Sequence, residues 1–241
     1  MGLVELLGFS DHGWGPALLR AAGMTLLLTA VALMIGALVG ALVAMAKLSS
    51  LRALRWLGEL YSLLLRGIPE LLVIYLFYFG GASMVSAVAH WFGAGEGYID
   101  VPPFAIGALA VGLISGSYQA EVYRGAYLAV PKGELEAAAA IGMSPALRLR
   151  RVLIPQVLRI ALPGLGNVWQ MSLKDSALIS VIGLVELMRA SQVAAGSTRQ
   201  YFTFYIVGGI GYLVLTWMSG RLFGVAEARV RRTRRTNPMH S

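Results

Sequence analysis

The sequence predicts an all-α membrane protein that crosses the bilayer several times. Of its 241 residues, 57% are hydrophobic and only 13% are charged, whereas an ordinary soluble domain carries about 25% charged residues. Several uncharged runs reach the length of about 20 residues that a helix needs to cross a bilayer. The basic residues gather in the segments between these runs. This composition does not supply the polar surface of a soluble globule, so it favours the membrane class.

Five helical spans are predicted within a single domain of residues 1–241. Three uncharged apolar runs are unambiguous, namely residues 21–46, 101–120 and 200–220. A fourth run, 71–95, contains several glycines from Gly80 onward, so we expect its helix to end there. A fifth segment is less uniform because it contains three charged residues. The predicted spans are 22–46, 57–80, 102–127, 160–187 and 201–226.

The distribution of Lys and Arg predicts the orientation of these spans. Fourteen Lys and Arg residues fall on one side of the predicted membrane and three on the other, Arg20, Arg189 and Arg199. We therefore expect the N-terminus outside and the loops 47–56 and 128–159, together with the C-terminus, in the cytoplasm. The net charge of +8 is explained by this topology signal and by attraction to anionic lipid, with no need for nucleic acid.

The long loop 128–159 is expected to form two short helices. Glu134 and Glu136 lie at the start of an alanine-rich helical segment, where the helix dipole favours acidic residues. Gly142 is a natural helix stop, and Ser144 followed by Pro145 is a typical helix start. These residues alone fit two interpretations equally well. The loop either forms a compact binding surface, or knob, for another protein, or it only connects two spans.

The same loop resembles the EAA loop of permeases of ABC importers. Glu136-Ala137-Ala138, Gly142 and Leu153-Ile154-Pro155 carry the resemblance. It implies a type I ABC importer permease fold and a coupling helix that docks on a separate ATPase subunit. The coupling residues implied are Glu134, Glu136, Ala137, Ala138, Gly142, Ser144, Pro145 and Pro155.

Further motifs resemble the polar amino-acid branch of these permeases, especially those for histidine, arginine, lysine, ornithine and opines. They are RGIPELLVIYLFYFG from Arg66, LPGLGNVWQ from Leu162 and LKDSALIS from Leu173. The resemblance implies import of polar, basic amino acids by alternating access in the bacterial cytoplasmic membrane. The implied partners are a second permease subunit, two cytoplasmic ATPase subunits and an extracytoplasmic binding protein.

The sequence points to no catalysis by this chain. It has no G-x-x-x-x-G-K-[ST] motif, so ATP and Mg²⁺ are expected on the partner ATPase and no cofactor on this chain. With no cysteine there is no disulfide or thiolate metal site, and no metal site is predicted.

Charged residues within spans are costly and usually face the bundle interior. In the second span, Arg66 and Glu70 flank Gly67 and Pro69, which predicts a helix break with an ion pair on one helix face. Glu121 and Arg124 are expected to pair near the inner end of the third span.

The fourth span is the best candidate for a substrate path. Asn167, Gln170 and Lys174 recur at helical spacing and so share one face. Ser172, Asp175 and Ser176 form a neighbouring polar strip, with Glu186 nearer the outer mouth. Pro163, Gly164 and Gly166 precede this polar face, which favours a kinked or broken helix. For a cationic amino acid, Asp175 is the expected carboxylate.

Alternative functions remain open from the sequence alone. One is a self-sufficient secondary transporter or channel, and another is a membrane scaffold that recruits a cytoplasmic protein. The Lys174-Asp175 pair also resembles permeases for uncharged polar amino acids such as glutamine. A membrane enzyme is disfavoured because no nucleophile, metal cluster or acid–base pair is evident.

Overall fold

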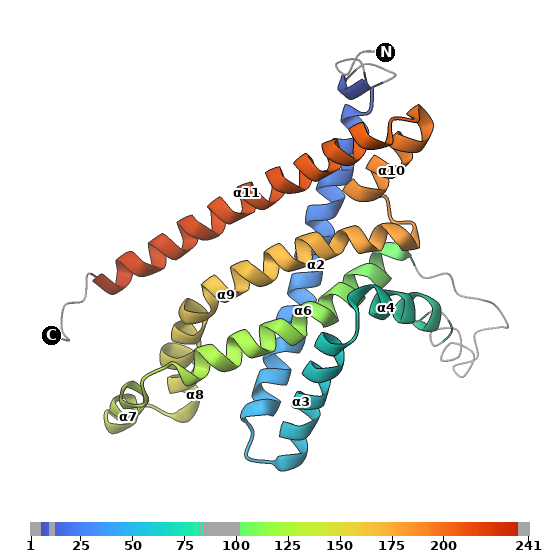
Figure 1. Ribbon diagram of the computed structural model, residues 1–241. Coiled ribbons are helices and arrows are strands. Elements are labelled where there is room, and N and C mark those ends of the chain that lie inside the picture. Colours follow the sequence, from blue (N-terminus) through green and yellow to red (C-terminus); the bar gives the residue numbers. More distant parts are fainter. Residues whose placement is uncertain (1–5, 10–12, 82, 84–101, 236–241) are drawn as a thin grey trace.

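The computed structural model describes residues 6–9, 13–81, 83 and 102–235. Every regular element in these ranges is helical, and Figure 1 shows their arrangement. The elements are α2 (Gly15–Leu48), α3 (Arg52–Gly67), α4 (Glu70–Tyr75), η1 (Leu76–Gly80), α6 (Pro103–Leu128), α7 (Lys132–Ala140), α8 (Pro145–Arg148), η2 (Leu149–Leu153), α9 (Ile154–Asp175), η3 (Ser176–Ile182), α10 (Leu187–Thr198) and α11 (Tyr201–Arg235).

The long helix α6 forms the centre of the bundle. In its most apolar stretch 67% of the residues are buried, against 28% in α2, 17% in the α8–η3 segment and 22% in α11. It packs against α2, α3, α4 and α9. The other helices therefore wrap α6 and leave broad apolar outer faces, such as that of Leu38, Leu213 and Trp217, which suit lipid or another subunit.

Glycines allow α2 and α6 to approach closely. A Cβ atom on Gly40 would lie 2.9 Å from the carbonyl oxygen of Gly116, and one on Gly112 would lie 2.8 Å from the Cβ of Ile35. Small residues in membrane helices bring backbones together in this way, and van der Waals packing then holds them. The glycines of the segment 36–44 thus bind α2 to the central helix.

The second predicted span is sharply bent. The axes of α3 and α4 with η1 differ by 105° across a break of two residues. Ile68 precedes Pro69, and a residue before proline avoids the helical conformation. Its ψ of 137° is extended, so α3 ends at Gly67 and a new helix begins at Glu70.

The predicted helix signals of the loop 128–159 are present in the structure. Gly142 has a φ of 80°, and the N–H of Met143 donates to the carbonyl of Ala138, while that of Gly142 donates to Ala139. This pair of bonds is a Schellman motif, which ends α7. Ser144 caps α8 by accepting a hydrogen bond from the Leu147 N–H, with Pro145 in the first helical position.

The fourth predicted span differs from expectation in where it is interrupted. The α9 helix continues through Pro163, where we expected a kink or break. The interruption comes later: a 3₁₀ segment, η3, follows Asp175 and ends at Gly183, whose φ is 93°. Upstream, the π-helical turn η2 precedes Pro155, whose missing N–H removes one helical hydrogen bond.

Four helical segments in the described ranges are long and apolar enough to cross a membrane, and there are five if the bent α3–α4 pair is counted as one span. The prediction of an all-helical, multi-span protein is confirmed. In Figure 1 the α2–α3 turn and α7 lie toward one end of the molecule, whereas α10 and the start of α2 lie toward the other.

Candidate functional site

A pocket opens at the bend between α3 and α4. It has a volume of about 310 Å³, within the range of small-molecule sites, and both charged and apolar groups line it. Its lining residues are Leu65, Arg66, Gly67, Ile68, Pro69, Glu70 and Tyr118. The helix break predicted from Gly67 and Pro69 therefore creates a concave surface beside the central helix.

Asp175 of α9 lies next to Glu70, one of the residues that line this pocket. Its carboxyl group interacts with that of Glu70, and Lys174 acts on it electrostatically. Arg66, Glu70 and Asp175 all act electrostatically on the Tyr118 hydroxyl. The fold thus gathers two carboxyl groups and one guanidinium around one tyrosine, from four different helices.

Arg66 and Glu70 lie on the two sides of the bend rather than on one helix face as expected. The α3 helix ends at Gly67 and α4 begins at Glu70, so the helical spacing of four does not apply across the break. Arg66 pairs instead with Glu121 of α6, with 3.8 Å between Nη1 and Oε1. Its guanidinium also lies 5.3 Å from the centre of the Tyr118 ring.

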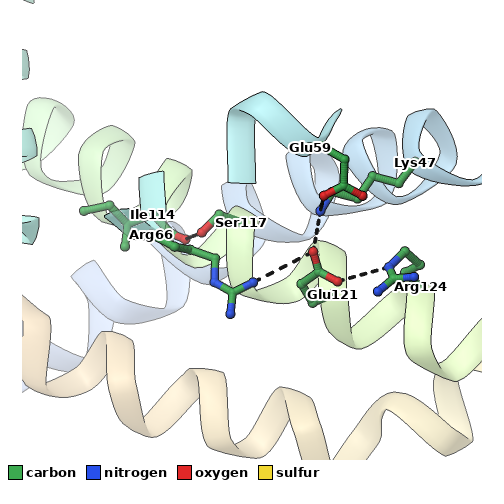
Figure 2. Close-up of polar contacts among 7 residues, drawn as sticks. All are labelled: Lys47, Glu59, Arg66, Ile114, Ser117, Glu121 and Arg124. Atoms are coloured by element: carbon green, nitrogen blue, oxygen red, sulfur yellow. Dashed lines mark hydrogen bonds and ion pairs between the residues drawn. The ribbon is translucent and has the colours of Figure 1, made fainter. Parts of the chain in front are cut away.

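Glu121 is the centre of a charge cluster that joins α2, α3 and α6 (Figure 2). Lys47, which is almost fully buried, pairs with Glu121 and with Glu59, at 3.1 Å from the latter. Arg124 donates from Nε to Glu121 at 3.0 Å, as the sequence predicts. Lys47, Glu59, Arg66, Glu121 and Arg124 together are called the charge cluster below.

The polar residues of α9 point in different directions. Asn167 and Lys174 are exposed, whereas Ser172 and Ser176 are buried, and the Ser176 hydroxyl donates to the Leu173 carbonyl. Gln170 lies toward α11. The structure therefore brings Asp175 next to Glu70 and leaves the two exposed residues on an outer face of α9.

Glu186 is fully buried and caps the N-terminus of α10. Its carboxylate accepts hydrogen bonds from the N–H groups of Met188 and Arg189, both at 2.8 Å, and from the Tyr212 hydroxyl at 2.6 Å. Thr25 of α2 adds a hydrogen bond at 3.5 Å. This glutamate links three helices, and all its partners belong to the chain itself.

The helices α7 and α8 form an exposed knob at one end of the molecule. Glu134, Glu136 and Ala137 are exposed, while Ala138 is buried. Ile141 at the tip is 74% exposed, on an element that is too short to cross a membrane. The side-chain amide of Gln156 donates to Glu134, which ties α7 to α9.

Three polar residues of the pocket and the charge cluster were missed by sequence reasoning, namely Tyr118, Lys47 and Glu59. Tyr118 lies one helical turn before Glu121, so its spacing from that charged residue was an available signal. Lys47 was counted only as a topology signal, yet its side chain is 1% exposed. Gly58 makes room for it, because a Cβ there would lie 2.8 Å from Cγ of Lys47.

Comparisons with known proteins agree with this architecture. Residues 32–232 match the family described as binding-protein-dependent transport system inner membrane component. The chain is 53% identical over 229 residues to the octopine transport system permease protein OccQ of Rhizobium meliloti, covering 95% of this chain and 96% of that protein. It is 38% identical over 218 residues to the histidine/lysine/arginine/ornithine transport system permease protein HisQ of Escherichia coli, covering 90% and 95%.

A solved structure shows the same fold. The chain is similar to one in the crystal structure of an amino acid ABC transporter with histidines, with a TM-score of 0.74, 34% identity and coverage of 90% of this chain and 95% of that one. The predicted ABC importer permease fold and the multi-pass inner-membrane location are confirmed. The protein is a transport component rather than an enzyme. This chain belongs to the family of inner membrane components of binding-protein-dependent transport systems.

Proposed function

We propose that the chain is the permease subunit of an ABC importer that carries basic amino acids or opines into the cytoplasm. The names of OccQ and HisQ refer to octopine and to histidine, lysine, arginine and ornithine, respectively. Both proteins match this chain over nearly its full length, so the substrate class transfers as a proposal about the whole subunit.

The pairing of Glu70 with Asp175 beside the pocket is the observation that best supports this substrate class. Two carboxyl groups held together repel each other when both are ionised, and a cation between them relieves that repulsion. Glu70 and Asp175 are half-buried, and the attraction of a carboxylate for a cationic side chain is stronger there than at a fully exposed position. We therefore assign the side chain of a bound basic amino acid to these two carboxylates.

The remaining polar residues of α9, together with Ser176 and Glu186 downstream, are assigned by their positions in the structure. Asn167 and Lys174 lie on an exposed face of α9, where they suit a hydrated path or a contact with the second permease subunit. Gln170 lies between this face and α11. Ser172 and Ser176 are buried, and we assign them to helix packing next to the path. Glu186 is assigned to the cap of α10 rather than to the path.

The α7–α8 knob is proposed to be the coupling loop. Its exposed residues around Glu136 and Ile141 would dock on a cytoplasmic ATPase, one of two that bind and hydrolyse ATP with Mg²⁺. The complete complex would contain a second permease subunit and an external binding protein. The excess of basic residues in the loops 47–56 and 128–159 and in the C-terminal segment supports a cytoplasmic location for that side and an outside N-terminus.

Alternating access would follow from this arrangement. Closure of the ATPase dimer would pull on α7 and α8, and the ends of α6 and α9 would transmit the movement to the pocket. Glu136→Lys or Gly142→Asp in the knob is expected to leave the subunit in the membrane but to reduce ATPase retention or coupled uptake by at least about tenfold. Normal ATP-driven uptake by both variants would contradict the docking assignment.

Uptake into proteoliposomes tests the substrate class. The complete complex would be reconstituted with the binding protein, ATP and labelled arginine, and unlabelled octopine, lysine and glutamine would compete. We expect octopine and lysine to compete and glutamine to have little effect. The Asp175→Asn variant should lower uptake of arginine strongly, whereas Leu158→Ala, at an exposed position of the same helix outside the pocket, should lower it little.

Other outcomes would select the alternative functions. Competition by glutamine alone would move the substrate to uncharged polar amino acids while keeping the importer. Uptake by this chain driven by an ion gradient, without ATPase subunits, would instead support a secondary transporter.

A further inference from the structure

The outer face of α3 is left uncovered by the described part of the chain. Gly58 and Ser62 are the buried residues of this helix, and Gly58 lies against Lys47 of α2. Four large apolar side chains on the outer face are between 46% and 69% exposed, namely Trp56, Leu57, Leu63 and Leu64. These residues form two pairs spaced seven apart, so they make two adjacent rows on one side of the helix. Such a face suits contact with hydrocarbon.

Two arginines stand at the beginning of the same helix. Arg52 and Arg55 are both exposed, and neither side chain forms an ion pair with a described residue. The first turn of α3 contains no acidic residue, and Glu59 one turn later is paired with Lys47 at 3.1 Å. Like charges three residues apart on a helix repel each other. An anion bound between the two guanidinium groups relieves this repulsion.

Basic, aromatic and aliphatic side chains follow one another along α3. Trp56 comes four residues after Arg52, and Leu63 comes seven residues after Trp56, so the three share one side of the helix. Leu63 lies about 16 Å from Arg52 along the helix axis, at a rise of 1.5 Å per residue. The hydrocarbon of one leaflet is about 15 Å thick, and Trp is enriched at its boundary with the headgroups. The outer face of α3 therefore has the polarity profile of a single phospholipid.

We propose that Arg52 and Arg55 bind the phosphate of an anionic phospholipid whose acyl chains lie along the outer face of α3. Guanidinium groups bind phosphate oxygens with paired, charge-assisted hydrogen bonds. Trp56 lies at the level of the lipid glycerol, between the phosphate and the chains. A zwitterionic lipid brings its own cation, which the two arginines repel, so the site selects anionic lipids. This lipid site goes beyond the transport function and does not depend on the substrate class.

Lipid titration of the complete transporter, followed by native mass spectrometry, tests the proposal. The purified complex in detergent is titrated with phosphatidylglycerol or with phosphatidylcholine of the same acyl chains, and the bound lipids are counted. We expect the tightest phosphatidylglycerol to bind at least about tenfold more strongly than phosphatidylcholine, since each basic residue near a headgroup contributes about fivefold. In the double variant Arg52→Gln/Arg55→Gln this preference should fall to about twofold or less.

Two further variants separate headgroup binding from other effects. Arg20→Gln/Arg199→Gln is the matched control, because it removes two exposed positive charges outside α3. It should retain the preference for phosphatidylglycerol. Trp56→Ala keeps both arginines and loses the aromatic anchor, so it should weaken the binding of both lipids and leave the preference between them unchanged.

An unchanged preference in Arg52→Gln/Arg55→Gln would overturn the proposal. Loss of the preference in Arg20→Gln/Arg199→Gln would also overturn it, because the effect would then follow total charge. Release of an ATPase or permease partner by Arg52→Gln/Arg55→Gln, with lipid binding unchanged, would make this face of α3 a protein contact instead. If the double variant does not assemble, Arg52→Gln alone decides, with an expected loss of about fivefold in phosphatidylglycerol affinity and an unchanged affinity as the contrary result.

Discussion

Glu186 illustrates how one buried carboxylate organises a membrane protein from within. Its oxygens accept from two backbone N–H groups at the start of α10, from Tyr212 of α11 and from Thr25 of α2. Backbone N–H groups at a helix start have no partner in the helix and favour a negative charge. The carboxylate thus satisfies α10 and fastens it to two other helices.

Glu186→Ala is expected to lower the free energy of unfolding by about 3 kcal/mol, because several buried donors lose their acceptor. Glu186→Gln keeps one acceptor oxygen for the backbone and should cost about 1 kcal/mol. Thermal unfolding of the complex in nanodiscs measures both. The KM for uptake by any surviving complex should remain that of the wild type, and a specific change in KM would instead place Glu186 on the substrate path.

At the level of residues, the sequence allowed some assignments and not others. The pairing of Glu121 with Arg124 follows from helical spacing, which is a local property. The association of Asp175 with Glu70 depends on how α9 crosses α4, and that is a tertiary property. Glu186 was assigned to the path because its partners come from three helices that the sequence alone does not place together.

Proline and glycine determine where several of the helices begin and end. The bend between α3 and α4 follows from Pro69, and the end of α7 follows from the positive φ of Gly142. Both positions were predicted. The continuation of α9 through Pro163 was not predicted. Neighbouring helices can hold a proline-containing helix together, and the residues of α9 alone do not show which helices pack against it.

Gly142→Ala should loosen the turn between α7 and α8, since a Cβ at a φ of 80° costs roughly 1–2 kcal/mol. We expect amide hydrogen exchange over 138–148 to become about fivefold faster or more in the assembled complex. Gly133→Ala is the control. It lies within α7 with open space around its Cβ and should slow exchange slightly. Equal exchange rates in the wild type and Gly142→Ala would contradict the role of this glycine in the turn.

Gly40→Leu is expected to disrupt the contact between α2 and α6. The added Cβ would meet the Gly116 carbonyl at 2.9 Å and the Ala120 nitrogen at 3.1 Å, and backbone atoms of a packed helix cannot move aside cheaply. The unfolding temperature of the complex and its yield should both fall. Gly23→Leu on the same helix, where no atom lies within 4 Å of the Cβ, should change them little.

The basic residues of the molecule gather toward one end. The α2–α3 turn and the α7–α8 knob share the basic end, while α10 lies toward the other (Figure 1). Composition and charge predicted an all-helical protein with several spans, because this class depends on sums over many residues. They did not predict the pocket, which depends on how a single bend is placed against α6 and α9.

The absence of cysteine makes the proposed topology directly measurable, since a single introduced thiol is the only one in the chain. Ser50→Cys, in the exposed α2–α3 turn, should react with a membrane-impermeant maleimide only from the cytoplasmic side. Ser197→Cys, exposed at the end of α10, should react in intact spheroplasts. Labelling of both thiols from the same side would contradict the orientation.

The bend at Ile68–Pro69 also affects how well the membrane can hold an ion gradient. The last carbonyl groups of α3 have no helical partner, and hydrocarbon offers them none, so a protein keeps such groups beside water. A hydrated pocket at this depth is a hazard in a membrane that maintains a proton gradient. The subunit must therefore stay impermeable to ions on both sides of the bend when no substrate is bound.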